Sequence, residues 1–482
     1  MRALLASRIG SKETFRTAIL LSGLIAVVVF IVFSPIYTPS FAPSLYDGAR
    51  SLELFALSQC AIVALYALTS KRLFNFFYIK PPIRKAVIGF FALACMSAAC
   101  SSSPLDAMAE VALTWLLVAL LIMVVILFQP RPVMTDRVLM AAYYFSALVF
   151  GTIFLISYCA TTNADASFNW YNHFIGFGNV RHFSQFQAYT LPLITLPMLL
   201  AVVPLRWRAV IFLIAAMWWG LQFAVGTRSV WLAASAAAIL LSLFLRSESY
   251  RWLLWQAKTL LAGAFIYFAS QHLFLTNDPG LGSVLQRGFD GSGRWELWRA
   301  ALGMIKESPL LGVGPMHYSF QNFGIAAHPH NAALQIASEY GLPAMCLVGL
   351  LVAYLLMNGI AWCKKSSGEN RHINIALLAS LLTGLTDSLL TGNNLMPHSQ
   401  FTLYVVAGWL IGRNVRIQAT MTEVQLEALS PRILMVALTA IALVTIVCYS
   451  GLYLQKLKSD TTVVLGEIAH PRFWQNGHWP VR

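Results

Sequence analysis

Seven side chains stand out in this sequence because their types could do chemistry and because they lie either in the longest stretch that could not sit in lipid or in and beside strongly apolar segments. They are Arg181, Arg228, Arg287, Arg294, His330, Asn331 and Asp387. The planar guanidinium of arginine binds phosphate oxygens through two parallel hydrogen bonds. A histidine can accept a proton from a hydroxyl group near neutral pH. The set could therefore hold a phosphate or pyrophosphate at a membrane surface and activate a hydroxyl beside it.

Each arginine also has a purely structural interpretation. Arg181 lies in the segment GFGNVRHFSQ and Arg228 lies in the short turn VGTRSVW, both beside apolar runs. A single basic residue at such a boundary more often extends its side chain to lipid headgroups. Several arginines on the same side of a membrane favour an anion instead, because their planar forks match phosphate oxygens.

His330, Asn331 and Asp387 likewise allow two interpretations each. His330 could simply lie near the beginning of a helix on which Asn331 bonds backbone amides. His317, His328 and His330 could suggest zinc, but they lack an HExxH-like helix and a clear carboxylate ligand, so we predict no metal and no cofactor. Asp387 lies inside an apolar run, where a buried acid needs a partner. It could form a structural ion pair, or it could orient His330 or an arginine.

The composition of the chain is far from that of a soluble protein. Its 482 residues are 58% hydrophobic and 11% charged, and its mean hydropathy is +0.67. Apolar runs of about 18 to 20 residues, the length that crosses a bilayer as a helix, recur along the chain. Segments such as 107–128 are apolar on every face, whereas the strands of a membrane barrel alternate. The sequence therefore predicts an all-α polytopic membrane protein.

We expect about 12 to 13 transmembrane helices, counted from the apolar runs that approach the thickness of a bilayer. They lie at 17–33, 52–69, 86–100, 107–128, 138–159, 186–203, 209–225, 229–245, 257–275, 344–362, 374–391, 400–412 and 433–454. This division gives an N-terminal bundle of about nine spans at 1–275, a large loop with the candidate site at 276–343, C-terminal helices at 344–454 and a tail at 455–482.

The basic residues predict the orientation of the chain. Most of the 33 lysines and arginines fall at the N-terminus and in alternate loops, which this span assignment places on one side. The short loops on the other side carry only Arg50, Arg181 and Arg228. Cytoplasmic loops are rich in Lys and Arg, so the N-terminus is expected in the cytoplasm and the large loop and the tail outside. The net charge of +14 is then a signal of topology and not of nucleic-acid binding.

The large loop contains a motif that resembles a known family. His330 and Asn331, followed after nine intervening residues by Gly341, resemble the signature of a superfamily of O-antigen ligases, O-antigen polymerases and bacterial protein O-oligosaccharyltransferases. The resemblance extends to Arg228 in GTRSVW, to Arg294 in GRWELW and to the turn PLLGVGP before the histidine. The family's general organisation, several membrane spans with one large outer loop, is also found here, so the resemblance extends over most of the chain.

Within this superfamily, Ala344 departs from the Gly, Thr or Tyr that protein-glycosylating members tend to carry three residues after the motif glycine, and so favours an O-antigen ligase. The resemblance implies a GT-C-type, metal-independent, inverting glycosyltransferase at the periplasmic face of a Gram-negative inner membrane. Its donor would be a glycan on undecaprenyl diphosphate and its acceptor a sugar hydroxyl of lipid A-core, both among membrane lipids. His330 would be catalytic, and the substrate-binding residues would be Arg181, Arg228, Arg287, Arg294, Asn331 and Asp387.

A protein that carries a polyprenyl lipid without reacting with it would also need arginines in a cavity. Such a carrier should have charges near the middle of the membrane or inverted repeats. In this sequence the candidate polar groups collect at one membrane face. That distribution favours an enzyme, but it does not separate ligase, polymerase and protein glycosylation.

Overall fold

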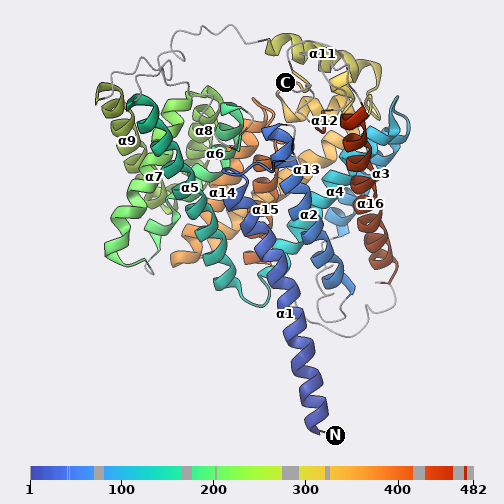
Figure 1. Cartoon of the computed structure of the whole chain (residues 1–482), viewed down its shortest axis with the longest axis horizontal. Coiled ribbons are helices and arrows are strands. Elements are labelled where there is room, and N and C mark those ends of the chain that lie inside the picture. Colours follow the sequence, from blue (N-terminus) through green and yellow to red (C-terminus); the bar gives the residue numbers. More distant parts are fainter. Residues whose placement is uncertain are drawn as a thin grey trace.

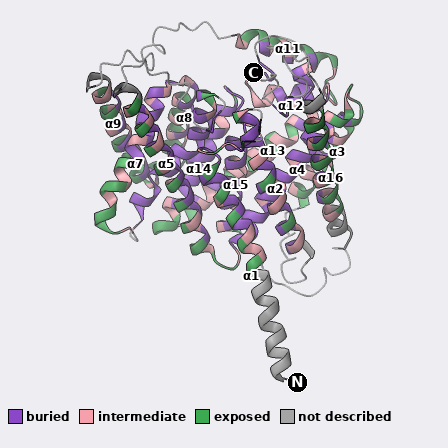
Figure 2. Cartoon of the chain, in the orientation of Figure 1, coloured by how far each residue is buried: buried purple, intermediate pink, exposed green. Residues whose placement is uncertain are grey.

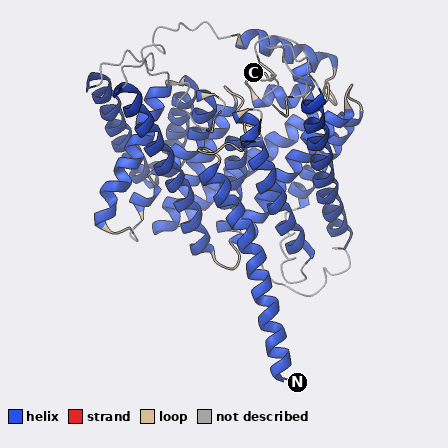
Figure 3. Cartoon of the chain, viewed as in Figure 1, coloured by secondary structure: helices blue, strands red, loops and turns tan. Residues whose placement is uncertain are grey.

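The computed structural model describes residues 2–40, 42, 44–69, 81–163, 176–177, 179–200, 203–273, 293–320, 326–415, 429–459 and 472–474. Every regular element in these ranges is a helix (Figure 3). Long helices run roughly side by side through most of the molecule (Figure 1). They are α1 (Arg2–Phe33), α2 (Leu45–Thr69), α3 (Pro81–Ala99), α4 (Pro104–Leu127), α5 (Pro132–Asn163), α6 (Val180–Ile194), α7 (Leu205–Val225), α8 (Arg228–Leu245), α9 (Tyr250–Leu273), α13 (Leu342–Lys365), α14 (Gly368–Ser388), α15 (Pro397–Asn414) and α16 (Leu429–Ser459). Shorter helices are η3 (Leu196–Leu199), η4 (Arg246–Glu248), α11 (Arg294–Glu307), η5 (His317–Phe320) and α12 (Ala332–Tyr340).

A helix lies at each apolar range that the sequence predicts as a span. In the described part of the chain, eight helices are long and apolar enough to cross a membrane, namely α2, α3, α4, α5, α7, α8, α13 and α16. The other five, α1, α6, α9, α14 and α15, have shorter apolar windows or more polar residues. The predicted fold class is confirmed, and the chain is a multi-pass, all-α membrane protein.

Helix α4 forms the core of one half of the bundle. Nearly all of its residues from Ala107 to Leu127 are buried, and it packs against α2, α3, α15 and α16. A helix that is apolar on every side belongs in the interior, because it has no polar face to offer to water. Burial is accordingly concentrated on the inward faces of the helices around it (Figure 2).

Helix α14 is also interior, although it is more polar, and it packs against α6, α8, α13 and α15. Gly384 lets α6 approach closely, since a Cβ atom there would lie only 1.9 Å from Cε1 of Tyr189. The hydroxyl of Ser380 donates to the backbone oxygen of Tyr189 at 2.6 Å. These two contacts fix the helix that carries Asp387 against the helix that carries Arg181.

Helix α6 ends early because Pro192 lies inside it, and the chain continues as η3. Proline cannot donate a backbone hydrogen bond, and in a lipid environment the carbonyl groups left free where the helix ends need other partners. Helix α9 supplies two of them. Trp252 Nε1 donates to the backbone oxygen of Pro192 at 3.1 Å, and Gln256 Nε2 donates to that of Leu191 at 3.2 Å.

A small outer unit lies at one end of the bundle, where α11 and α12 are found (Figure 1). Its own apolar cluster contains Leu297 and Met304 of α11 together with Tyr318 of η5. The Tyr318 hydroxyl donates to the backbone oxygen of Leu297 at 2.8 Å. The unit lies within the predicted loop 276–343, and α13 begins at Leu342 directly after it.

The C-terminal part differs in detail from the expected tail at 455–482. Helix α16 continues to Ser459, and the short segment Arg472–Trp474 is buried against the bundle. That segment contacts residues near the outer unit, as described below.

The predicted orientation can be tested with one cysteine in the outer unit, which precedes α13, and one just after α13. Helix α13 has 24 residues and is therefore about 36 Å long. In a variant without the seven native cysteines, Glu307→Cys lies at the end of α11 and Ser367→Cys follows α13, and both positions are exposed. We expect a membrane-impermeant thiol reagent to label the cysteine at position 307, but not that at 367, in intact spheroplasts. The opposite pattern would reverse the orientation, and lysed membranes serve as the control for reactivity.

Candidate active site

Four helices of the described chain begin with candidate residues. Arg181 is the second residue of α6, and Arg228 is the first residue of α8. Arg294 is the first residue of α11, and Asn331 caps α12 directly after His330. The first turn of a helix leaves backbone N–H groups without partners and carries the positive end of the helix dipole. Each of these arginines therefore adds its charge to a helix end that already attracts anions.

The electrostatic interactions show that these groups lie close together. The charges of Arg294 and Arg181 act on His330, and the charges of Arg181 and Arg228 act on Arg294. Neither Arg181 nor Arg294 forms a salt bridge with a carboxylate among the described residues. Burial lowers the pKa of Arg294, the charges of Arg181 and Arg228 lower it further, and the carboxylate of Asp387 opposes them. The cluster thus holds an excess of positive charge that a bound anion would relieve.

The beginnings of α6 and α8 are fixed by local hydrogen bonds. Asn179 caps α6, and its side-chain oxygen accepts from the backbone N–H of Arg181 at 2.9 Å. Gly226 ends α7 in the left-handed region at φ 62°, a conformation that costs glycine little. Gln222 Nε2 then donates to the oxygen of Thr227 at 3.2 Å. This turn places Arg228 at the first position of α8 with little freedom in its backbone.

His330 has an unusual backbone conformation and an unusual environment. Its φ of 53° is in the left-handed region, which a side chain such as histidine occupies only where the surrounding structure holds it. Trp298 of α11 supplies one constraint, because its Nε1 donates to the oxygen of Pro329 at 3.0 Å. Burial, followed by the charges of Arg294 and Arg181, lowers the pKa of His330 to about 4. The imidazole is therefore neutral at physiological pH and able to accept a proton.

Asn331 connects α12 to the end of α14. Its Oδ1 accepts from the backbone N–H of Leu334 at 3.0 Å, as an N-cap does. Its Nδ2 donates to the backbone oxygen of Leu389 at 3.0 Å. Losing a cap costs about 1 kcal/mol of helix stability, but here the same side chain also fixes α12 against α14.

Asp387 is fully buried near the end of α14. Its Oδ2 accepts hydrogen bonds from Thr391 Oγ1 and from Asn393 Nδ2, both at 2.8 Å. The charge of Arg294 acts on it, and Ser229 lies close to it. The carboxylate therefore holds the segment that follows α14, and it interacts with the charge of Arg294. It accepts its hydrogen bonds from Thr391 and Asn393 and not from His330.

Two motif glycines are required by close backbone packing. Gly341 has φ 89°, and a Cβ atom there would lie 2.1 Å from the oxygen of Leu310. Gly312 has φ 68°, and its Cβ would lie 2.4 Å from the carbonyl carbon of Glu339. Such contacts exclude any side chain. The turn at 309–315 therefore lies directly on the end of α12, and the two glycines allow this close backbone packing.

The remaining candidates are placed as follows. Arg287 lies outside the described residues. No group of three or more His, Cys, Asp and Glu side chains that could hold a metal occurs in the described part. Within the zinc candidates, the ring of His328 lies 4.3 Å from that of His330, whereas His317 Nε2 accepts from the backbone N–H of Ser103 at 3.0 Å.

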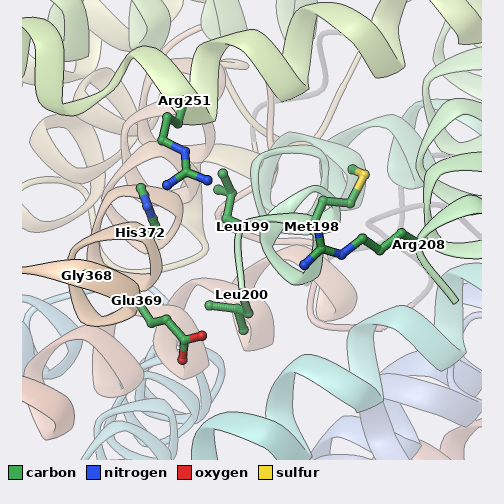
Figure 4. Close-up of a pocket in the computed structure, with 8 residues that line it drawn as sticks. All are labelled: Met198, Leu199, Leu200, Arg208, Arg251, Gly368, Glu369 and His372. Atoms are coloured by element: carbon green, nitrogen blue, oxygen red, sulfur yellow. The ribbon is translucent and has the colours of Figure 1, made fainter. Parts of the chain in front are cut away.

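A pocket of about 230 Å³ lies at the beginning of α14, the opposite end of that helix from Asp387. Arg208, Arg251 and His372 are among the side chains that line it (Figure 4). Arg208 and Arg251 belong to the basic ranges that the positive-inside rule predicts on the cytoplasmic side, so we do not include this pocket in the candidate site.

Sequence reasoning did not find several residues that shape the site. Thr391 and Asn393 hold Asp387, Trp298 fixes the backbone before His330, and Glu339 joins several elements, as described below. The only available signals were their proximity to the motif in sequence and, for Asn393, a polar residue next to an apolar run. Neither signal indicates a partner.

The fold and the site together define an integral membrane protein with a cationic, histidine-containing site at one end of its helix bundle. Residues 209–349 match the family described as O-Antigen ligase. The matched segment contains Arg228, Arg294, His330 and Gly341. This similarity supports a glycosyltransferase-like enzyme with a function of the O-antigen ligase or polymerase kind. A comparison with curated proteins finds no match.

The lowered pKa of His330 can be measured by chemical modification. Diethyl pyrocarbonate reacts with neutral imidazole, so His330 with a pKa of about 4 should react almost fully at about pH 5.5, roughly tenfold more than an ordinary histidine of pKa about 6.5. Mass spectrometry of the modified peptide gives the extent of reaction, with unfolded protein as the reference. Because the charge of Arg294 lowers this pKa, Arg294→Met should decrease the reactivity at that pH. Equal reactivity in folded and unfolded protein would contradict the assignment.

Proposed function

We propose that the protein is an O-antigen ligase, which transfers a glycan from undecaprenyl diphosphate to a sugar hydroxyl of lipid A-core. The observation that carries this proposal is the meeting of Arg181, Arg228 and Arg294 with His330 at the beginnings of four helices. The family match at residues 209–349 supports the same class of reaction. The proposal places the reaction at the periplasmic face of a Gram-negative inner membrane.

The arginines suit the donor because the leaving group is a diphosphate. Its bond to the anomeric carbon breaks, and negative charge develops on the phosphate oxygen that departs. Fixed guanidinium groups and helix ends stabilise such charge without having to rearrange during the reaction. Arg294 and Arg181 are suitable because no described carboxylate forms a salt bridge with them.

His330 suits the acceptor because its imidazole is neutral in the free protein. As the acceptor oxygen attacks the anomeric carbon, its proton passes to the imidazole nitrogen. A glycosidic bond forms while the bond to diphosphate breaks, and undecaprenyl diphosphate leaves as the second product. Attack from the face opposite the leaving group inverts the anomeric centre. Every step is a proton or group transfer, so no redox cofactor is needed.

Asn331 and Asp387 are proposed to position these groups. Asp387 fixes Thr391 and Asn393, and in the same region Leu389 accepts a hydrogen bond from Asn331. Movement of this segment would shift the beginning of α12 and with it His330. The role proposed for Asp387 is therefore to support the site and to balance part of the charge of Arg294.

The identity of the acceptor, the most specific part of the proposal, can be tested directly. Purified protein should transfer a polyprenyl-diphosphate-linked glycan to rough lipopolysaccharide, and not to a second donor molecule or to a pilin-like protein. Because the described residues contain no cluster of metal ligands, we expect exhaustive chelation to leave the rate unchanged. Transfer to the second donor would identify a polymerase, transfer to the protein a protein glycosyltransferase, and binding without transfer a carrier.

The role of His330 can be tested by His330→Gln, which keeps a polar side chain but removes the titrating group. General-base assistance is typically worth about 10² to 10⁴ in rate, so we expect a loss of that size in kcat with a folded, inserted protein. His328→Gln is the matched control, because His328 lies two residues away with its ring next to that of His330. The control should retain far more activity. Normal turnover by His330→Gln would remove the base assignment.

A further inference from the structure

Arg472 lies far along the chain from the candidate site but is buried in the interior, with 3% of its surface exposed. Its guanidinium donates to both carboxylate oxygens of Glu339, one of them at 2.7 Å. It also lies 3.5 Å from Oε1 of Glu110 in α4. Burial lowers the pKa of Arg472, but Glu339 and Glu110 raise it by more, so the group is charged. One side chain thus connects α4, in the core of the helix bundle, to the last turn of α12.

The neighbours of Arg472 hold it in place. Phe473 lies under the guanidinium of Arg50, whose Cζ is 5.4 Å from the ring centre. Its ring also contacts Tyr449 of α16, at 5.3 Å between centres. Trp474 stacks on Tyr453 of the same helix at 4.8 Å. Aromatic contacts of this kind add to the burial of apolar area, so the segment is anchored on α16.

Glu339, the main partner of Arg472, joins the elements of the outer unit. Its Oε1 accepts from the backbone N–H of Tyr318 at 3.1 Å. Its backbone oxygen accepts from the N–H of Gly314 at 3.0 Å and from Ser97 Oγ of α3 at 2.9 Å. Glu339 therefore ties the turn at 309–315, η5 and α3 to the end of α12.

These contacts lead to the groups of the proposed reaction. Tyr318, held by Glu339, bonds Leu297 of α11 through its hydroxyl, and α11 begins with Arg294. Glu339 itself is part of α12, which His330 precedes. The position of Arg294 relative to His330 thus depends on the carboxylate that Arg472 binds. A carboxylate buried as fully as Glu339 is costly without a cation beside it.

We propose that Arg472 is a positioning residue of the transfer reaction, which aligns His330 with the arginine cluster by binding Glu339 and Glu110. The inference rests on the proposed function, because it concerns the geometry of that reaction. Arg472 does not touch the reacting groups and acts only through α11 and α12. A misplacement of about 1 Å can cost about 10² in rate, so a small shift of these helices is sufficient.

A variant that removes only the charge would leave two buried carboxylates without their cation, and it could fail to fold for that reason alone. The experiment therefore compares Arg472→Met with the triple variant Arg472→Met, Glu110→Gln, Glu339→Gln, in which the cation and both of its carboxylate partners are removed together. Transfer to rough lipopolysaccharide is measured with the purified, full-length protein. We expect the triple variant to regain the thermal stability of the wild type in detergent. Its kcat should still be about 10²-fold lower, while KM for the donor changes much less.

Arg472→Lys tests geometry separately from charge. Lysine keeps the cation but loses the planar fork that bonds both oxygens of Glu339. We expect it to restore part of the kcat lost in Arg472→Met. Arg413→Met is the matched control, because Arg413 also forms a largely buried ion pair, with Asp136, but far from α11 and α12. It should lower thermal stability without lowering the kcat of the folded protein.

Wild-type kcat in the triple variant would overturn the positioning role and leave Arg472 as a structural anchor. An equal loss of kcat in Arg413→Met would do the same, because the effect would then follow general stability. A wild-type protein that transfers no glycan to any acceptor would contradict the proposed function instead. In that case hydrogen exchange of α12 tests the contact itself, and unchanged protection in the triple variant would refute the coupling of Arg472 to α12.

Discussion

Repulsion between the guanidinium groups of Arg181, Arg228 and Arg294 is the physical constraint on which the rest of the site depends. The charges of Arg181 and Arg228 lower the pKa of Arg294, and the beginnings of four helices add further positive potential. A free protein can keep such an arrangement only if the backbones that carry the charges are held rigidly. The devices that hold them are local: a capped turn at Asn179, a left-handed glycine at 226 and a glycine before Arg294 at φ 70°.

The outer unit meets the same requirement by close packing. Gly312 and Gly341 allow the turn at 309–315 to lie directly on the end of α12, where any side chain would collide with the backbone. The backbone oxygen of Glu339 accepts a hydrogen bond from that turn, and its carboxylate accepts one from η5. Because α11 and α12 share an apolar cluster, Arg294 and His330 cannot move independently. The motif glycines are thus explained by backbone geometry, while the chemistry belongs to the side chains that they bring together.

Much of the fold could be predicted from the sequence, because a bilayer imposes a length and an apolar composition on each span. The helices predicted at 107–128 and 344–362 agree with α4 and α13 to within three residues at each end. The break of α6 at Pro192 was not predicted, since it depends on partners in α9. The candidate site residues were also chosen from the sequence. In the structure the charges of Arg181, Arg228 and Asp387 act on Arg294, and those of Arg294 and Arg181 act on His330, while the roles of these residues stay predictions. The partners of Asp387 were not predictable in the same way. The sequence suggested His330 or an arginine, whereas its hydrogen bonds come from Thr391 and Asn393.

The arrangement of charge also bears on how a histidine with so low a pKa can serve as a base. In the free protein, burial and the charges of Arg294 and Arg181 lower the pKa of His330 to about 4, and a base so weak takes up a proton reluctantly. In the proposed reaction, the diphosphate of the donor brings negative charge to those same arginines. Its charge would oppose theirs, so binding of the proposed donor would raise the pKa of His330. The histidine then becomes a stronger base only when a leaving group is in place, which couples proton transfer to the presence of the donor.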